Sequence, residues 1–143
     1  MNKKNAYLFF SFFLFLSCQN ELKDNKPVIT ELQNETLKMY EQGKLIFLEK
    51  CAQCHNNNMI TDGTGSPLGG ITKRSTKEWL RAYVRSPEKM IEKNDSQALV
   101  LLEKKRVIMQ GFPDYTDAEL DQIFLYIETT YQNNKIRLHP VER

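Results

Sequence analysis

Cysteine is scarce in this chain, which has 3 cysteines among 143 residues. So few cysteines exclude a scaffold held by several disulfides, and packing or a bound cofactor must therefore stabilise the fold. A dominant charge is also lacking, because 20 lysines and arginines balance 18 aspartates and glutamates. No strong field favours nucleic acid, and we expect no nucleic-acid partner. The length and the 41% hydrophobic content fit one folded domain.

A hydrophobic run long enough to span a membrane is absent as well. The longest run, Ala6–Leu16, has about half of the roughly 20 residues that a spanning helix needs. Lys3 and Lys4 precede this run and Ser17 follows it, which is the layout of a signal peptide over residues 1–17.

The end of this segment, Phe15, Leu16, Ser17 and Cys18, resembles the lipobox of bacterial lipoproteins. The resemblance implies cleavage before Cys18 and attachment of a lipid to its thiol. It also implies export to the bacterial cell envelope, where the chain is anchored to a membrane and faces the periplasm. The alternative is an ordinary signal peptide followed by an unpaired cysteine, whose free thiol is open to oxidation outside the cytoplasm.

The rest of the chain is divided by composition into a tether, a domain and a tail. Polar residues dominate 18–36, which predicts a flexible tether. Helical spacing of apolar residues places one domain at 37–132, and a polar tail follows at 133–143. Because no convincing strand pattern is present, the sequence predicts an all-α fold of three to five helices.

Two helices of this domain carry clear packing signals. In the first, over 37–51, Gly43 lies on the apolar side, which indicates close approach by another helix. The last begins at a cap formed by Thr116 and Glu119. Its apolar residues have the spacing of a core-facing helix; they are Leu120, Ile123, Phe124, Ile127 and Tyr131. Residues 56–74 predict a long loop, and such loops usually wrap something.

The chemistry is concentrated in the run Cys51, Ala52, Gln53, Cys54, His55, a CxxCH motif that is typical of c-type haem attachment. Two thiols at this spacing can each add to one vinyl group of a haem. The next residue then presents its imidazole to the iron. Covalent attachment keeps such a cofactor bound in a small exported domain.

Two other kinds of site use the same residue types. A structural zinc site usually has four protein ligands, and His139 would have to join Cys51, Cys54 and His55. A thiol redox pair of the thioredoxin kind needs a βαβ context, whereas here a helix precedes the cysteines and a glycine-rich loop follows them. Both remain alternatives to haem attachment at this point.

Beyond the motif, the chain resembles class I cytochromes c over about residues 37–132. Gly43 and Phe47 match a glycine and an aromatic residue in the first helix of that family, just before CxxCH. The segment from Met109 to Leu120 looks like the loop of the axial methionine and the start of the last helix, in which Tyr126 matches a packing aromatic. Gln110 stands where the family usually has proline.

This resemblance implies one covalently attached haem c, with His55 and Met109 as axial iron ligands. It also implies that the carbonyl of Pro67 accepts a hydrogen bond from the imidazole. Met59 is close to the motif in sequence and Met90 has a helical context, so neither fits the ligand position as well. His139, in the polar tail, is the alternative second ligand.

The expected function is one-electron transfer, without enzymatic catalysis, between respiratory complexes or dehydrogenases and a terminal oxidase or reductase. Redox partners would dock transiently, and a basic run is a candidate part of the docking surface: Lys73, Arg74, Lys77, Arg81 and Arg85. A solvated helix face is the alternative explanation of that run. The alternative functions are an open-coordination haem protein for gas sensing or peroxidase chemistry, and a structural haem subunit of a larger complex.

Overall fold

The computed structural model describes residues 26–138. Cys18, His139 and the segment interpreted as a signal peptide lie outside these residues. The elements in chain order are α1 (Lys26–Ile46), the π-helical turn η1 (Phe47–Cys51), α2 (Ile71–Arg74), α3 (Lys77–Arg85), α4 (Pro87–Glu92), α5 (Ser96–Lys105) and α6 (Asp117–Leu138). The described part of the chain contains no strand, which confirms the all-α prediction. The described residues form six α-helices, one more than the predicted upper limit of five; two of them, α2 and α4, are short, with 4 and 6 residues.

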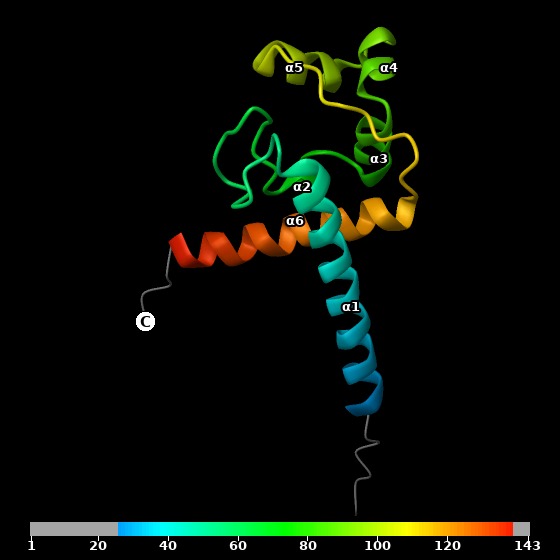
Figure 1. Ribbon diagram of the computed structural model, residues 1–143, viewed down its shortest axis with the longest axis vertical. Coiled ribbons are helices and arrows are strands. Elements are labelled where there is room, and N and C mark those ends of the chain that lie inside the picture. The colour runs from blue at the N-terminus through cyan, green and yellow to red at the C-terminus, as the bar shows by residue number, and fades with distance from the viewer. Residues whose placement is uncertain (1–25, 139–143) are drawn as a thin grey trace, which may run out of the picture.

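The two long helices cross where the C-terminal end of α1 meets the first half of α6 (Figure 1). At the crossing, a Cβ placed on Gly43 would lie 1.9 Å from the carbonyl oxygen of Gln122. The close helix approach predicted from Gly43 is therefore confirmed. Phe47 and Tyr40 both pack on the ring of Tyr126, with ring centroids 5.2 and 5.3 Å apart, respectively.

The hydrophobic core forms around this crossing, mainly on the apolar face of α6. It consists of Phe47, Met59, Leu80, Leu120, Ile123, Phe124, Tyr126 and Ile127. The predicted core-facing stripe of α6 is thus buried, and Tyr131 packs at its edge. Helices α2 to α5 and the loop before them lie on one side of α6, as Figure 1 shows. None of the helices in residues 26–138 has the length and apolar character needed to cross a membrane.

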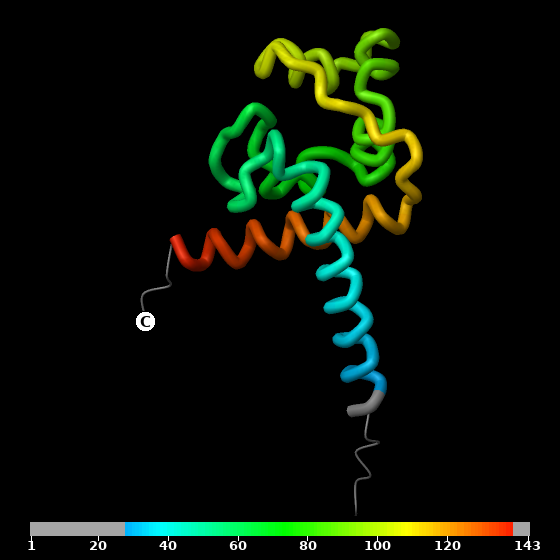
Figure 2. The backbone as a smooth tube through the Cα atoms, viewed as in Figure 1, coloured from blue at the N-terminus to red at the C-terminus, as the bar shows by residue number. Residues whose placement is uncertain are grey.

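Both ends of the predicted domain are more helical than the sequence pattern indicates. Helix α1 begins at Lys26, so the prediction of a flexible tether is wrong for residues 26–36. Helix α6 continues to Leu138, so the polar tail is helical over 133–138. The N-terminal half of α1 projects away from the other helices (Figure 2). Its polar composition resembles that of a tether, but no glycine or proline interrupts residues 28–42.

Helix α3 is fixed to α6 by ion pairs. The guanidinium of Arg81 donates to both carboxylate oxygens of Asp121 at 2.8 Å and lies 3.1 Å from Asp117. Arg85 donates to Asp117 and to the carbonyl of Tyr115. Lys77 lies 3.5 Å from Asp121. These members of the predicted basic docking run therefore stabilise helix packing.

We expect Gly43→Ala to lower the free energy of unfolding by about 1–3 kcal/mol, because the added methyl group overlaps the α6 backbone. The better helix propensity of alanine offsets about 1 kcal/mol at most. Denaturant unfolding of the haem-loaded chain, followed by circular dichroism, measures the change. Lys38→Ala on the exposed face of α1 is the control and should leave stability nearly unchanged. Equal stabilities of the two variants would contradict the importance of the crossing.

Candidate functional site

The CxxCH motif lies in a tight turn at the end of η1. The amides of Cys54 and His55 both donate to the carbonyl of Cys51, at 3.1 and 3.0 Å. The π-helical hydrogen bond from Ala52 to the carbonyl of Phe47, at 2.9 Å, joins this turn to the buried aromatic core. Both cysteines are free thiols, Cys51 half-buried and Cys54 exposed. The motif is therefore held close to the α1–α6 crossing.

The thiol of Cys51 is not activated for redox chemistry. Burial, and to a lesser degree the neighbouring Cys54, raises the pKa of Cys51 to about 11. Reactive cysteines of thiol oxidoreductases have lowered pKa values instead. The electrostatic environment of Cys51 therefore differs from that of a reactive thioredoxin-like cysteine.

The imidazole of His55 is oriented by a backbone carbonyl. Its Nδ1 lies 2.8 Å from the carbonyl oxygen of Ser66. Because a carbonyl only accepts, Nδ1 carries the proton and donates, which leaves the Nε2 lone pair available to a metal. Burial lowers the pKa of His55, outweighing the opposite effect of the Ser66 hydrogen bond, and so favours the neutral ring. His55 thus has the protonation and tautomer of an iron ligand.

The acceptor of this hydrogen bond corrects the prediction for Pro67. The structure gives the role to Ser66, one residue earlier, while the carbonyl of Pro67 lies 3.4 Å from the guanidinium of Arg74. The family resemblance indicated that a loop carbonyl after Gly65 is the partner, but the spacing of the loop decides which one. Nothing in the side chain of Ser66 marks its carbonyl, so the residue was not identifiable from sequence.

The glycine-rich loop wraps the imidazole itself. A Cβ on Gly65 would lie 2.4 Å from Cε1 of His55, so only glycine lets the backbone pass this close to the ring. The amide of Gly65 also donates to the carbonyl of Cys54 at 2.7 Å. The prediction that this long loop wraps something is therefore confirmed for the His55 side chain.

Two basic side chains hold the loop from outside. Arg74 donates to the carbonyl of Gly69, and Lys105 of α5 donates to the carboxylate of Asp62 and to the carbonyl of Gly63. The hydrogen bond from Lys105 lowers the pKa of Asp62. Neither role is marked by a sequence pattern. The Lys105 contacts join residues more than 40 positions apart. They tie the His55 loop to the helix that precedes Met109.

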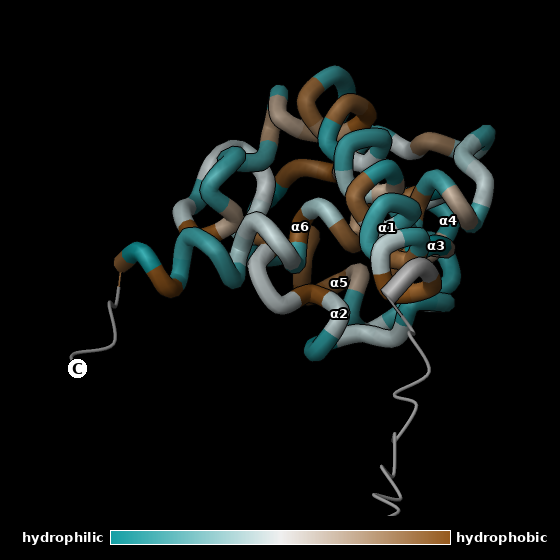
Figure 3. Tube along the Cα trace, turned by 90° about the horizontal axis from the view of Figure 1, so that it is seen from below, coloured by the Kyte–Doolittle hydropathy of each residue, from teal (hydrophilic) through white to brown (hydrophobic). Residues whose placement is uncertain are grey.

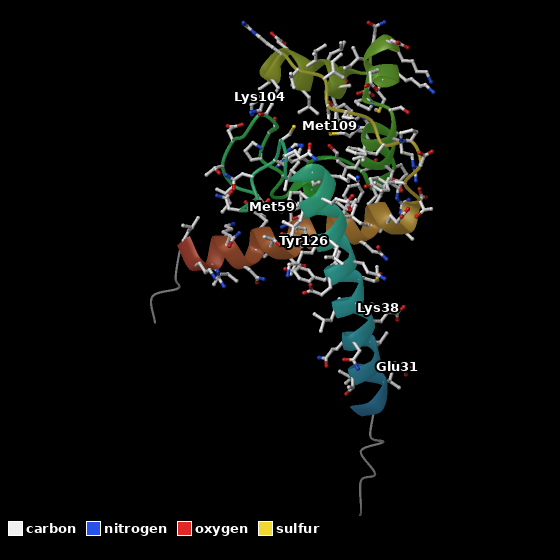
Figure 4. All side chains as sticks on the ribbon, in the orientation of Figure 1. Glu31, Lys38, Met59, Lys104, Met109 and Tyr126 are labelled. Atoms are coloured by element: carbon white, nitrogen blue, oxygen red, sulfur yellow. The ribbon has the colours of Figure 1, made fainter. Side chains whose placement is uncertain are left out.

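The methionines differ in their availability. Met59 is 1% exposed and belongs to the core, close to α6, whereas Met109 is half-buried on the segment between α5 and α6 (Figure 4). This segment is attached to α3 by a 2.9 Å hydrogen bond from the amide of Phe112 to the carbonyl of Val84. Met59 thus packs with the core residues of α6, and Met109 lies on the same side of α6 as the His55 loop (Figures 1 and 4).

These residues fit a covalently attached haem better than a directly bound metal. Within residues 26–138, no group of three or more His, Cys, Asp and Glu side chains forms a metal cluster. The free thiols and the neutral imidazole instead suit a cofactor that brings its own iron. On the same loop, the hydroxyl of Ser66 is buried without a hydrogen-bond partner from the described residues. A polar edge of a bound group would satisfy that oxygen.

Comparison with known proteins agrees with this chemistry. The family model described as "Cytochrome c" matches residues 40–131. A cytochrome c from Rhodothermus marinus has a similar fold, with a TM-score of 0.59 and 20% identity over 68% of this chain and 80% of that chain. At this identity the similarity shows the fold alone. No curated protein matches the chain.

Gly65→Ala should displace the imidazole of His55, since the added carbon would overlap the ring. We expect a loss of about 1–3 kcal/mol in the free energy of unfolding and a smaller fraction of chains that carry haem. Denaturant unfolding and haem quantification by absorbance measure the two effects. Thr64→Ala, at the exposed neighbouring residue, is the control. Full haem loading and unchanged stability of Gly65→Ala would refute the tight fit of loop and ring.

Proposed function

Since this chain belongs to the cytochrome c family, we propose that it is a one-electron carrier with a single haem c, whose axial ligands are His55 and Met109. Family membership establishes the coarser function, electron transfer by a covalently bound haem c. The observation that supports His55 is its Nδ1 hydrogen bond to Ser66, which leaves Nε2 free for iron. Bound haem c supplies an iron that gains and loses one electron.

The residues of this chain attach and orient the group. Cys51 and Cys54 provide the two thiols for attachment, and the Ser66 carbonyl fixes the ring of His55. Arg74 and Lys105 keep the wrapping loop in place. Rigid surroundings favour electron transfer, because the protein then rearranges little when the charge of the iron changes.

Met109 is proposed as the second ligand. Its half-buried position contrasts with the buried Met59, and its segment follows the helix that carries Lys105. Histidine and methionine together raise the reduction potential and leave no iron position for a substrate. This ligand pair therefore favours a carrier over a gas sensor or a peroxidase.

A matched pair of variants tests this ligand. Met109→Leu and Met59→Leu both replace a thioether with a side chain of similar volume, at a stability cost below about 1.5 kcal/mol. We expect only Met109→Leu to abolish the weak far-red sulfur-to-iron band of the oxidised protein and to lower its reduction potential. Absorbance spectroscopy and potentiometry measure both.

The outcome separates the candidate functions. A band that survives in Met109→Leu would assign the ligand elsewhere. Carbon monoxide binding by the unchanged protein at neutral pH would indicate an open coordination position and favour gas sensing or peroxidase chemistry.

We further propose that the carrier docks transiently on respiratory complexes or dehydrogenases and on a terminal oxidase or reductase. Of the basic run considered for docking, Lys73 alone lacks an ion pair or side-chain hydrogen bond within residues 26–138. The other four hold the loop or attach α3 to α6. Docking through this run would therefore rest on Lys73, which is exposed.

We also propose export to the bacterial cell envelope and lipid anchoring at Cys18. Haem attachment to proteins of this family takes place outside the cytoplasm, which agrees with the signal-peptide layout of residues 1–17. The Lys3, Lys4 and Cys18 pattern supports this proposal from the sequence alone.

Replacement of the proposed lipid attachment site tests the anchor. We expect the unchanged chain to stay in the membrane fraction after a high-salt wash and Cys18→Ser to appear in the soluble fraction with its haem spectrum intact. Fractionation followed by haem staining measures the distribution. If Cys18→Ser remained in the washed membranes, lipidation of this cysteine would be rejected.

A further inference from the structure

Lys105, the last residue of α5, joins two segments that are far apart in the sequence. Its ammonium group binds the carboxylate of Asp62 and donates to the carbonyl of Gly63 at 3.2 Å, across 43 and 42 positions of the chain. The side chain of Lys105 is 17% exposed, whereas its basic neighbours Lys104 and Arg106 are exposed. Lysine side chains are mostly exposed unless their charge is paired. Lys105 is therefore part of the packed structure, unlike these two neighbours.

The contacts of Lys105 hold the middle of the loop that wraps His55. Helix α6 binds that loop near its ends, at residues 58 and 72, and Lys105 binds it at residues 62 and 63. Gly63 itself packs on the CxxCH turn, since a Cβ there would lie 2.6 Å from the carbonyl oxygen of Cys54. Lys105 therefore keeps the loop against the turn that carries the two thiols.

Hydrogen bonds continue from Gly63 towards the carbonyl that orients the imidazole. The amide of Gly63 donates to the carbonyl of Gly65 at 3.1 Å, and the amide of Gly65 donates to the carbonyl of Cys54 at 2.7 Å. The next carbonyl along the chain, that of Ser66, accepts from Nδ1 of His55 at 2.8 Å. A shift of Gly63 would therefore move the group that fixes the ring of His55.

On its other side, Lys105 adjoins the segment that carries Met109. Helix α5 ends at Arg106, whose left-handed backbone, with φ of 55°, redirects the chain directly after Lys105. Met109 follows three residues later. Beyond it, the amide of Phe112 attaches the segment to α3. Met109 thus lies between two fixed points, of which Lys105 is the one that contacts the His55 loop.

We propose that Lys105 is a positioning residue, which fixes the His55 loop against the Met109 segment and so protects the second iron position from external ligands. This inference rests on the proposed function, because it takes His55 as an iron ligand of bound haem c. When the Lys105 contacts are lost, the two segments can separate. A methionine thioether is a weak axial ligand, so the Met109 side yields first to a stronger ligand such as imidazole.

Matched variants separate positioning from charge. Lys105→Met and Lys104→Met each remove one positive charge and keep a long side chain, but only Lys105→Met removes the contacts with Asp62 and Gly63. We expect haem-loaded Lys105→Met to bind imidazole at least about tenfold more tightly than the unchanged chain, as the loss of one hydrogen bond from a charged group implies. Lys104→Met should bind it like the unchanged chain. Lys105→Arg, which keeps the charge and the donors, should recover most of the difference.

Titration of the oxidised full chain with imidazole, followed by the Soret band, measures these affinities. The reduction potential is the second readout, measured by potentiometry. Lys105→Met should have a lower potential than Lys104→Met, because a weakened methionine bond lowers the potential while both variants lose the same charge. Circular dichroism and the haem spectrum confirm that each variant is folded.

A second variant keeps the test decisive if Lys105→Met does not take up haem. Asp62→Asn removes the ion pair and leaves the contact of Lys105 with Gly63 in place. It should also bind imidazole more tightly than the unchanged chain, but by a smaller factor, because the carboxylate of Asp62 is 61% exposed and such pairs are weak.

Equal imidazole affinities of Lys105→Met and Lys104→Met would overturn the proposal. A Lys105→Arg variant that binds imidazole as tightly as Lys105→Met would overturn it as well. Failure of the proposed function is a separate result, because a far-red band that survives in Met109→Leu refutes Met109 as the ligand. The comparison of the two lysine variants then still decides whether Lys105 protects the second iron position.

Discussion

The crossing of α1 and α6 is the contact on which the rest of the molecule depends. Gly43 permits it, because any larger residue would overlap the backbone of Gln122. The close approach lets Phe47 reach the ring of Tyr126, and the turn that carries the CxxCH motif begins in the same π-helical segment. The position of the turn that carries the CxxCH motif is therefore set by a contact between two backbones.

Helix α6 also positions the loop that wraps His55. Glu128 accepts hydrogen bonds from the amide and hydroxyl of Thr72, and Asn134 donates to the carbonyl of Asn58. Gly69 packs against the ring of Tyr131. The loop thus lies between α6 on one side and Lys105 on the other, and the Ser66 carbonyl is placed on the imidazole by contacts from both.

Patterns local in sequence predicted the features that depend on local geometry. The CxxCH motif, the apolar stripe of α6 and the position of Gly43 each follow from helical periodicity or from the spacing of thiols. Two features depend on where distant segments meet. The His55 imidazole pairs with the carbonyl of Ser66 instead of that of Pro67, and Lys105 contacts the loop. The helical state of residues 26–36 was not predicted, because their polar composition resembles that of a tether although no glycine or proline interrupts residues 28–42.

The same crossing explains why one chain has two unlike surfaces. On one side of α6 the side chains of Phe47 and Leu80 contribute to the core, and the loop closes over His55. On the other side α1 and α6 diverge from Gly43, so neither helix covers the exposed apolar residues of the other (Figure 3). Extension of both helices beyond the core therefore adds no further core within one chain.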